Sequence, residues 1–264
     1  MKQINQNSKQ NKKKKKKWQA VLAMASMMLA GAVCGYFMAG WFVDGIENSA
    51  TYDTGSKIIS LLIMFLEMCL ALFLDIIIHE SGHLVFGLLT GYRYSSFRIG
   101  SLMLIKEDGK MKWKKLSLAG TGGQCLMVPP AMQDGKIPYV LYNLGGSIFN
   151  VVFGGLFLGI YLVMPDVQYV SLFFLMTAVM GFASALMNGI PLQMGAVNND
   201  GYNAISLGKD KEALYSFWIQ MKANEQIARG VRVKDMPDEW FEMPTAEGMK
   251  NSMTAVRACL CAIV

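Results

Sequence analysis

The pentapeptide His79-Glu80-Ser81-Gly82-His83 holds both histidines of the 264-residue chain. If this segment is helical, residues four apart project from the same face, so the two imidazoles could bind one Zn²⁺ ion. Glu80 would lie beside that ion, where a carboxylate can accept a proton from a bound water as general base. Ionisable groups inside a membrane span are costly and usually functional. The sequence therefore predicts a zinc site with His79 and His83 as ligands and Glu80 as catalytic residue.

The third ligand of this site must be an acid or a cysteine, because the chain has no third histidine and a catalytic zinc usually has three protein ligands. Asp75 lies one helical turn before His79, but three ligands on one helix make a poor tetrahedral cage. Asp75 would instead hydrogen-bond an imidazole or face a neighbouring helix. Glu67 is a second local candidate. Asp200 follows the last apolar segment at the depth of the histidines and is the predicted third ligand.

The composition places the chain in a membrane. Apolar residues make up 53% of it and charged residues only 17%, against about 45–50% and about 25% in soluble domains. Long stretches without lysine or arginine alternate with short, strongly charged ones, and this distribution excludes an ordinary soluble globular protein and a disordered chain. Four apolar segments reach the roughly 20 residues that a membrane-spanning helix needs. They cover residues 18–43, 58–89, 139–164 and 170–190.

The distribution of lysine and arginine predicts the orientation of these spans. Six lysines at residues 12–17 precede the first span, which is too long for the apolar core of a signal peptide. Next to a span, such a run binds acidic headgroups rather than nucleic acid. With the N-terminus in the cytoplasm, the basic segment 91–137 also lies there, as the positive-inside rule requires. We expect a multi-pass protein of a bacterial plasma membrane with both termini in the cytoplasm.

The expected fold class is an all-α polytopic membrane protein with a small cytoplasmic β-hairpin between the second and third spans. Strand-like runs at residues 97–105 and 111–118 flank an Asp-Gly turn. This hairpin at 97–118 is either a solvated connector or an edge to which an extended substrate adds. The scattered cysteines predict no disulfide framework. The expected domains are a basic tail (1–17), an extra transmembrane helix (18–43), a core (58–201) and a cytoplasmic helical tail (202–264).

Three motifs in the core resemble the site-2 protease family of intramembrane zinc metalloproteases. They are the pentapeptide at 79–83, the GxxxN pattern of residues 146–150, and Asn188 and Pro191 followed by Asp200-Gly201. The resemblance implies zinc held by His79, His83 and Asp200, with Glu80 as base. It also implies that Asn150 and Asn188 hold the backbone of an extended substrate. The stretch between Pro191 and Asp200 is longer than is typical of the family, and Asn199 replaces the usual leucine.

The function expected from these residues is an intramembrane zinc endopeptidase. It would cut membrane-anchored peptides or single-span proteins in the lipid bilayer near the cytoplasmic side. Two alternatives are a non-catalytic membrane protein that keeps the metal for structure, and a divalent-ion transporter. A transporter would also explain the acids Glu67 and Asp75, and its ion flux would survive the loss of Glu80. The sequence gives no oligomeric state.

Overall fold

The computed structural model describes residues 28–40 and 54–261, together with residues 18, 21, 24, 25 and 43, apart from residues 108, 117–121, 165, 166, 168, 195 and 196. The chain divides into two compact units. The first unit comprises Met1–His79 and Ser147–Met187, and the second comprises Glu80–Gly146 and Asn188–Val264. The division falls inside one continuous helix, between His79 and Glu80.

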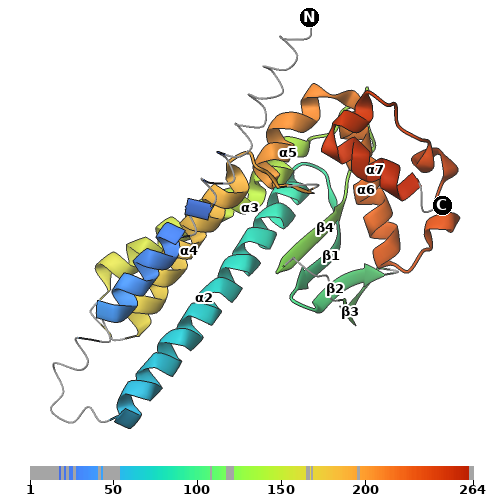
Figure 1. Ribbon diagram of the computed structural model, residues 1–264. Helices are drawn as coiled ribbons and strands as arrows, with labels where there is room; N and C mark the ends of the chain where they lie inside the picture. The colour runs from blue at the N-terminus through green and yellow to red at the C-terminus, as the bar shows by residue number, and fades with distance from the viewer. Residues whose placement is uncertain are drawn as a thin grey trace, which may run out of the picture. The chain divides into compact units, whose positions relative to one another are not determined.

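Three helices are long and apolar enough to cross a membrane: α2 (Thr54–Leu89), α3 (Tyr139–Val163) and α4 (Val170–Gly189) (Figure 1). Three of the four predicted apolar segments are thereby confirmed as helices of this kind. With 36 residues, α2 is about 54 Å long and exceeds the roughly 30 Å of hydrocarbon. The predicted first span at 18–43 lies partly outside the described residues, which include a shorter apolar helix, Met28–Gly40.

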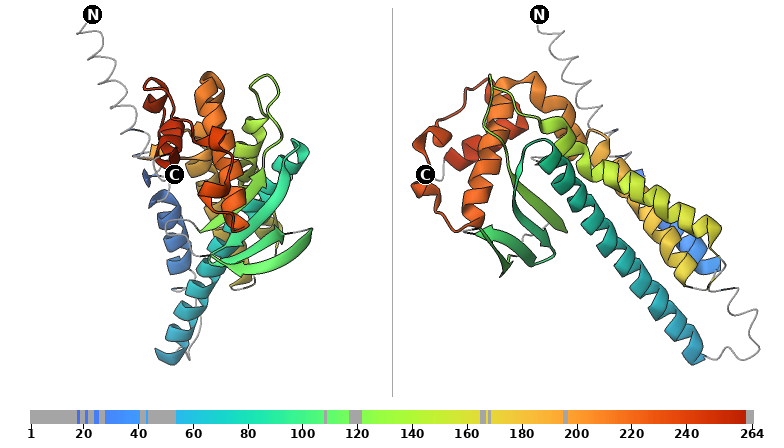
Figure 2. Two further views of the ribbon diagram at one scale, coloured as in Figure 1. Left: turned by 90° about the vertical axis from the view of Figure 1, so that its right-hand side faces the viewer. Right: turned by 180° about the vertical axis from the view of Figure 1, so that it is seen from behind.

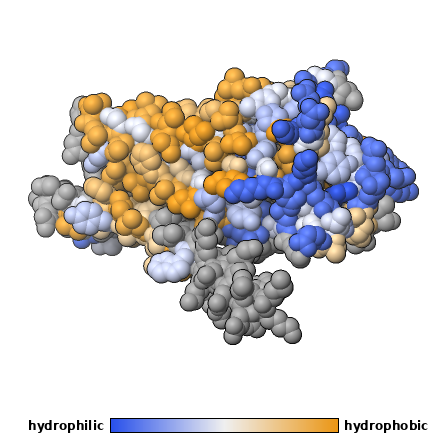
Figure 3. Space-filling view, turned by 90° about the horizontal axis from the view of Figure 1, so that it is seen from above, coloured by the Kyte–Doolittle hydropathy of each residue, from blue (hydrophilic) through white to orange (hydrophobic). Residues whose placement is uncertain are grey.

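The first unit has an apolar interior and an apolar exterior. Met64 and Ala71 of α2 pack with Leu172 and Met176 of α4 in a buried cluster. Large apolar side chains also point outward, and hydrophobic residues cover a continuous part of the surface in Figure 3. The exposed ones on α2 include Ile58, Ile59, Leu61, Leu62, Phe65 and Leu66. An exterior of this kind is suited to hydrocarbon, so the chain has the character of a membrane protein.

The second unit contains a four-stranded antiparallel sheet in the order β3-β2-β1-β4. Its strands are β1 (Arg93–Ile99), β2 (Leu102–Glu107), β3 (Lys110–Lys115) and β4 (Gly123–Val128). Helix α6 (Lys211–Ala228) packs against this sheet, mainly along β4 (Figure 2). The fold is therefore mostly helical with a four-stranded sheet, which corrects the expected all-α class with a single hairpin.

The predicted strand at 97–105 is wrong, because Gly100 turns the chain in its middle. The φ of Gly100 is 57°, in the left-handed region that favours glycine. Ile99 and Leu102 therefore face each other on adjacent strands. The one turn that the sequence predicted is at Gly109, where φ is 76°, and it joins β2 to β3. Apolar residues flank Gly100 on both sides, so the sequence pattern hides that turn.

The rest of the second unit is built of short elements after α4. The short strands β5 (Gln193–Met194) and β6 (Val197–Asn198) form a two-stranded ladder. Helices α5 (Asp200–Ser206), α6 and α7 (Ser252–Cys261) follow. The 3₁₀ turns are η1 (Leu207–Lys209), η2 (Val233–Asp235), η3 (Asp238–Phe241) and η4 (Gly248–Lys250). A buried cluster joins β4, the start of α3 and the C-terminal helices, with Met127, Tyr142 and Phe217 among its members.

Candidate metal centre

Helix α2 carries both histidines one turn apart, and Asp200 is the first residue of α5. Each of the three residues offers one ligand atom, and these atoms lie within 4.8 Å of one another. Nε2 of His83 is 3.3 Å from Oδ2 of Asp200. Two ligand atoms bound tetrahedrally to one ion at about 2.0–2.1 Å are themselves about 3.3 Å apart. The group of His79, His83 and Asp200 could therefore hold a metal ion.

The ring of His83 is fixed by the main chain of α3. Its Nδ1 lies 2.8 Å from the carbonyl oxygen of Tyr142. A carbonyl oxygen only accepts, so Nδ1 donates and carries the proton. The lone pair of neutral His83 is then on Nε2, the atom next to Asp200. Metal-binding histidines usually have such a partner, which sets both the tautomer and the orientation of the ring.

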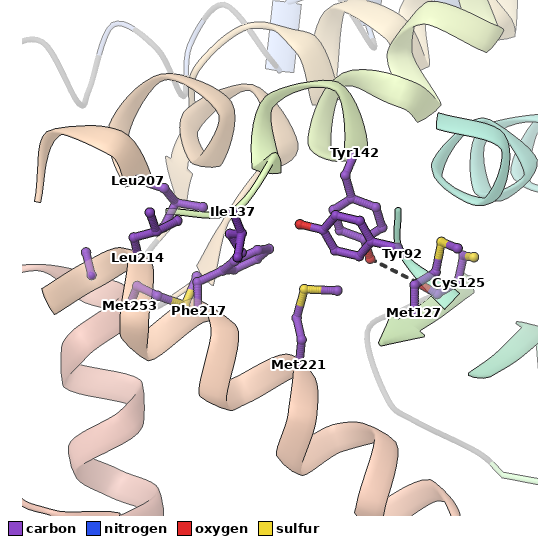
Figure 4. Close-up of a cluster of buried hydrophobic side chains, with 11 residues drawn as sticks. Tyr92, Cys125, Met127, Ile137, Tyr142, Leu207, Leu214, Phe217, Met221 and Met253 are labelled. Atoms are coloured by element: carbon purple, nitrogen blue, oxygen red, sulfur yellow. Dashed lines mark hydrogen bonds between the residues drawn. The ribbon is translucent and has the colours of Figure 1, made fainter. Parts of the chain in front are cut away.

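Glu80 contacts the edge of the sheet. The main-chain N–H of Cys125 in β4 donates to Oε2 of Glu80 over 2.7 Å. Figure 4 shows the second hydrogen bond of Cys125, whose carbonyl accepts from the hydroxyl of Tyr142 over 3.3 Å. Strand β4 pairs with β1 and is an edge strand, so these polar groups of Cys125 point to its outer side. Burial, followed by the charge of Glu80, raises the pKa of the Cys125 thiol. The thiol therefore stays protonated beside the carboxylate.

Close backbone packing brings the turn of α2 that carries His83 against the start of α3. A Cβ on Gly82 would collide with the carbonyl oxygen of Gly145, and a Cβ on Gly145 would meet the carbonyl of Gly82 at 2.5 Å. Small residues allow helices to approach this closely. The approach places Tyr142, one turn before Gly145, where its carbonyl reaches His83.

Asp200 is positioned by Asn199, which caps α5. Oδ1 of Asn199 accepts from the N–H of Tyr202 over 3.0 Å and from the N–H of Leu192 over 2.8 Å. Its Nδ2 donates to the carbonyl of Ile190 over 2.6 Å. Asn199 therefore closes the long segment between Pro191 and Asp200 into a loop. The ladder of β5 and β6 takes up the additional residues of this segment.

The other predicted site residues lie in different surroundings. Asn150 of α3 is buried and its Nδ2 is 3.4 Å from Nδ1 of His79. Asn188 is half-buried at the end of α4, with its main-chain oxygen beside Gly201. Asp75 accepts a hydrogen bond from Ser184 of α4. Of the two roles expected for Asp75, this contact corresponds to facing a neighbouring helix. Glu67 has a buried Oε2 without a hydrogen-bond partner among the described residues.

Four contributors to the site were not predicted from the sequence. The carbonyl of Tyr142 and the N–H of Cys125 are main-chain groups. Every residue has the carbonyl and every residue but proline has the N–H, so no residue type marks them. Gly145 lies in a Gly-Gly pair of an apolar segment, which is a signal for close helix packing. Asn199 directly precedes a helix, a position at which asparagine is a strong N-cap.

Comparisons of the chain with models of protein families, with curated proteins and with solved structures found no match.

Proposed function

We propose that this protein is an intramembrane zinc endopeptidase of the site-2 type, which hydrolyses peptide bonds of membrane-anchored peptides or single-span proteins near the cytoplasmic side. The observation that carries the proposal is the position of Glu80. This residue is next to a potential metal ligand, but its carboxylate is not one of the potential ligands. Glu80 is adjacent in sequence to His79, and its carboxylate is held toward β4. A purely structural metal site does not need this carboxylate.

A zinc ion bound by these three residues would activate a water and polarise the scissile carbonyl. Glu80 accepts the proton of the attacking water and returns it to the leaving amine. Cys125 holds one oxygen of Glu80 through its N–H, which limits the rotation of the carboxylate. Asp200 and His83 provide their ligand atoms from fixed positions, since Asn199 and Tyr142 orient them.

A peptide bond in a helical substrate is shielded, because each carbonyl accepts a hydrogen bond within its own helix. The substrate must therefore unwind near the site, and its freed polar groups then need partners in an environment with little water. Asn188 lies next to Gly201 at the start of α5. In this proposal its amide is one of the groups that hold the extended backbone.

The test is Glu80→Gln in full-length protein reconstituted in vesicles. The probe is a single-span peptide with a Gly-Pro pair in its spanning helix and a fluorophore and quencher at its ends. The glutamine oxygen can still accept from Cys125, so the fold and one bound zinc per chain should persist. Loss of the general base should lower cleavage about 10²–10⁴-fold.

The matched control is Glu67→Gln, which removes a carboxylate from the same helix and should leave cleavage unchanged. Cleavage by Glu80→Gln at the wild-type rate would refute the proposal. Zinc flux into vesicles that persists in Glu80→Gln and is lost in Glu67→Gln would instead identify a transporter.

A further inference from the structure

The side chain of Asn150 lies beside Nδ1 of His79. It is only 1% exposed, and both residues belong to the first unit. The distance from its Nδ2 to Nδ1 of His79 is 3.4 Å. In this orientation of the amide, Oδ1 of Asn150 is buried and has no hydrogen-bond partner among the described residues.

The two ends of an asparagine amide have the same shape, so the hydrogen-bonding environment decides which end faces the ring. A neutral imidazole has one N–H and one lone pair. If Nε2 of His79 binds the metal, Nδ1 carries the proton and needs an acceptor. Nδ2 of Asn150 cannot accept, whereas Oδ1 can. Metal binding through Nε2 therefore requires the amide to present Oδ1 to His79.

His83 provides the precedent within the same site. Its Nδ1 donates to the carbonyl oxygen of Tyr142, and its Nε2 faces Asp200. Both Tyr142 and Asn150 belong to α3, two turns apart. An amide oxygen of Asn150 at His79 would give both imidazoles the same arrangement, with an acceptor from α3 on the far side of each ring.

We propose that Asn150 is a positioning residue of the metal site: its Oδ1 accepts the proton on Nδ1 of His79 and so fixes Nε2 as the ligand atom. This inference rests on the metal site of the proposed function, and it gives Asn150 a role other than holding substrate. Replacing the outer partner of a metal-binding histidine typically costs 10- to 100-fold in metal affinity.

The first experiment examines the tautomers directly. The chain has only two histidines, so ¹⁵N labelling of their rings gives a simple long-range ¹H–¹⁵N spectrum of zinc-loaded protein in micelles. The expected result is a protonated Nδ1 and a metal-bound Nε2 in both rings. A His79 that binds zinc through Nδ1, or that is protonated on Nε2, would overturn the inference.

The second experiment measures zinc affinity by competition with a chromophoric chelator. Asn150→Leu should weaken zinc binding about 10- to 100-fold, and Asn150→Asp should restore it to within a few-fold of wild type because a carboxylate also accepts. The matched control is Asn143→Leu, which removes another buried amide of α3, one that donates to the carbonyl of Tyr139. This control should keep wild-type affinity. Unchanged affinity in Asn150→Leu, or lost affinity in Asn150→Asp, contradicts the inference.

These experiments separate the inference from the proposed function. Zinc bound with the expected tautomers, but without peptide cleavage, refutes the protease and leaves the role of Asn150 intact. Conversely, an Asn150→Leu protein with normal zinc affinity and no cleavage supports substrate binding and refutes the positioning role. If Asn150→Leu does not fold, the tautomers in the wild-type spectrum and the zinc affinity of Asn150→Asp test the positioning role.

Discussion

The main-chain N–H of Cys125 and the carboxylate of Glu80 form a 2.7 Å hydrogen bond that joins the edge of a β-sheet to a helix long enough to span a membrane. Strand β4 thereby orients the carboxylate without a side chain. Because a main-chain donor is involved, substitutions at position 125 can alter the thiol while the N–H remains. The orientation of the Glu80 carboxylate therefore depends on the backbone of the second unit.

Asp200→Ala should weaken zinc binding by more than the roughly 10- to 100-fold that outer partners contribute, because it removes a ligand atom 3.3 Å from Nε2 of His83. Equilibrium dialysis with zinc measures this change. Asp210→Ala is the matched control, since Asp210 caps α6 and its loss should lower stability by about 0.5–2 kcal/mol with zinc affinity unchanged. Equal zinc affinities of the two variants would exclude Asp200 as a ligand.

Gly82→Ala should destabilise the protein by about 1–3 kcal/mol or more, the usual effect of overpacking. The added methyl group would collide with the carbonyl of Gly145, and separation of the two helices would move Tyr142 away from His83. Thermal unfolding in detergent measures the effect. Gly155→Ala places the same methyl group in open space on α3 and should be neutral or slightly stabilising. A stable Gly82→Ala protein would disprove the close approach.

Asn199→Ala should lower zinc affinity although Asn199 is not a ligand. The variant loses the cap of α5 and the ties to Leu192 and Ile190, so Asp200 would no longer be held in place. A lost cap alone costs about 0.5–2 kcal/mol. Asn199→Asp keeps an oxygen for both N–H groups and should retain most of the affinity. The chelator competition assay applies here, and no change in Asn199→Ala would contradict the assigned role.

Cys125 should resist alkylation at pH 8, because burial raises its pKa above the ordinary 9.0 and the thiolate is the reactive form. A raised pKa means that the thiolate appears only at higher pH. Cys259 is exposed and should react at least about tenfold faster with iodoacetamide, as measured by peptide mass spectrometry. After unfolding in denaturant the two rates should become similar. Rapid modification of Cys125 in the folded protein would contradict its burial.

Glu212 should make the second unit less stable in acid. Its carboxylate accepts from the hydroxyl and the N–H of Thr245, and these hydrogen bonds lower its pKa below the ordinary 4.5. A folded-state pKa below the unfolded value gives stability that is complete above pH 4.5 and is lost as the pH falls through the folded-state value. Glu212→Gln should unfold with less pH dependence below pH 5, and an unchanged acid transition would argue against this contact.

The sequence by itself determined the features that depend on local periodicity and composition. The length and hydropathy of three segments predicted α2, α3 and α4, because a spanning helix satisfies its own backbone groups. The spacing of His79 and His83 was sufficient to place both imidazoles on one face. Asp200 was predicted from the order of the spans and from the absence of a third histidine.

Only the tertiary structure decided which backbone groups complete the site. The carbonyl of Tyr142 and the N–H of Cys125 act through main-chain atoms, which have the same chemistry at almost every position, so their roles follow from the approach of α3 and β4 to α2. The sheet was underestimated for a related reason: a turn at Gly100 depends on its φ, and the pairing of β4 with β1 joins residues far apart in sequence. Periodicity reports which face of an element is apolar, whereas the choice of neighbour depends on packing that is not local.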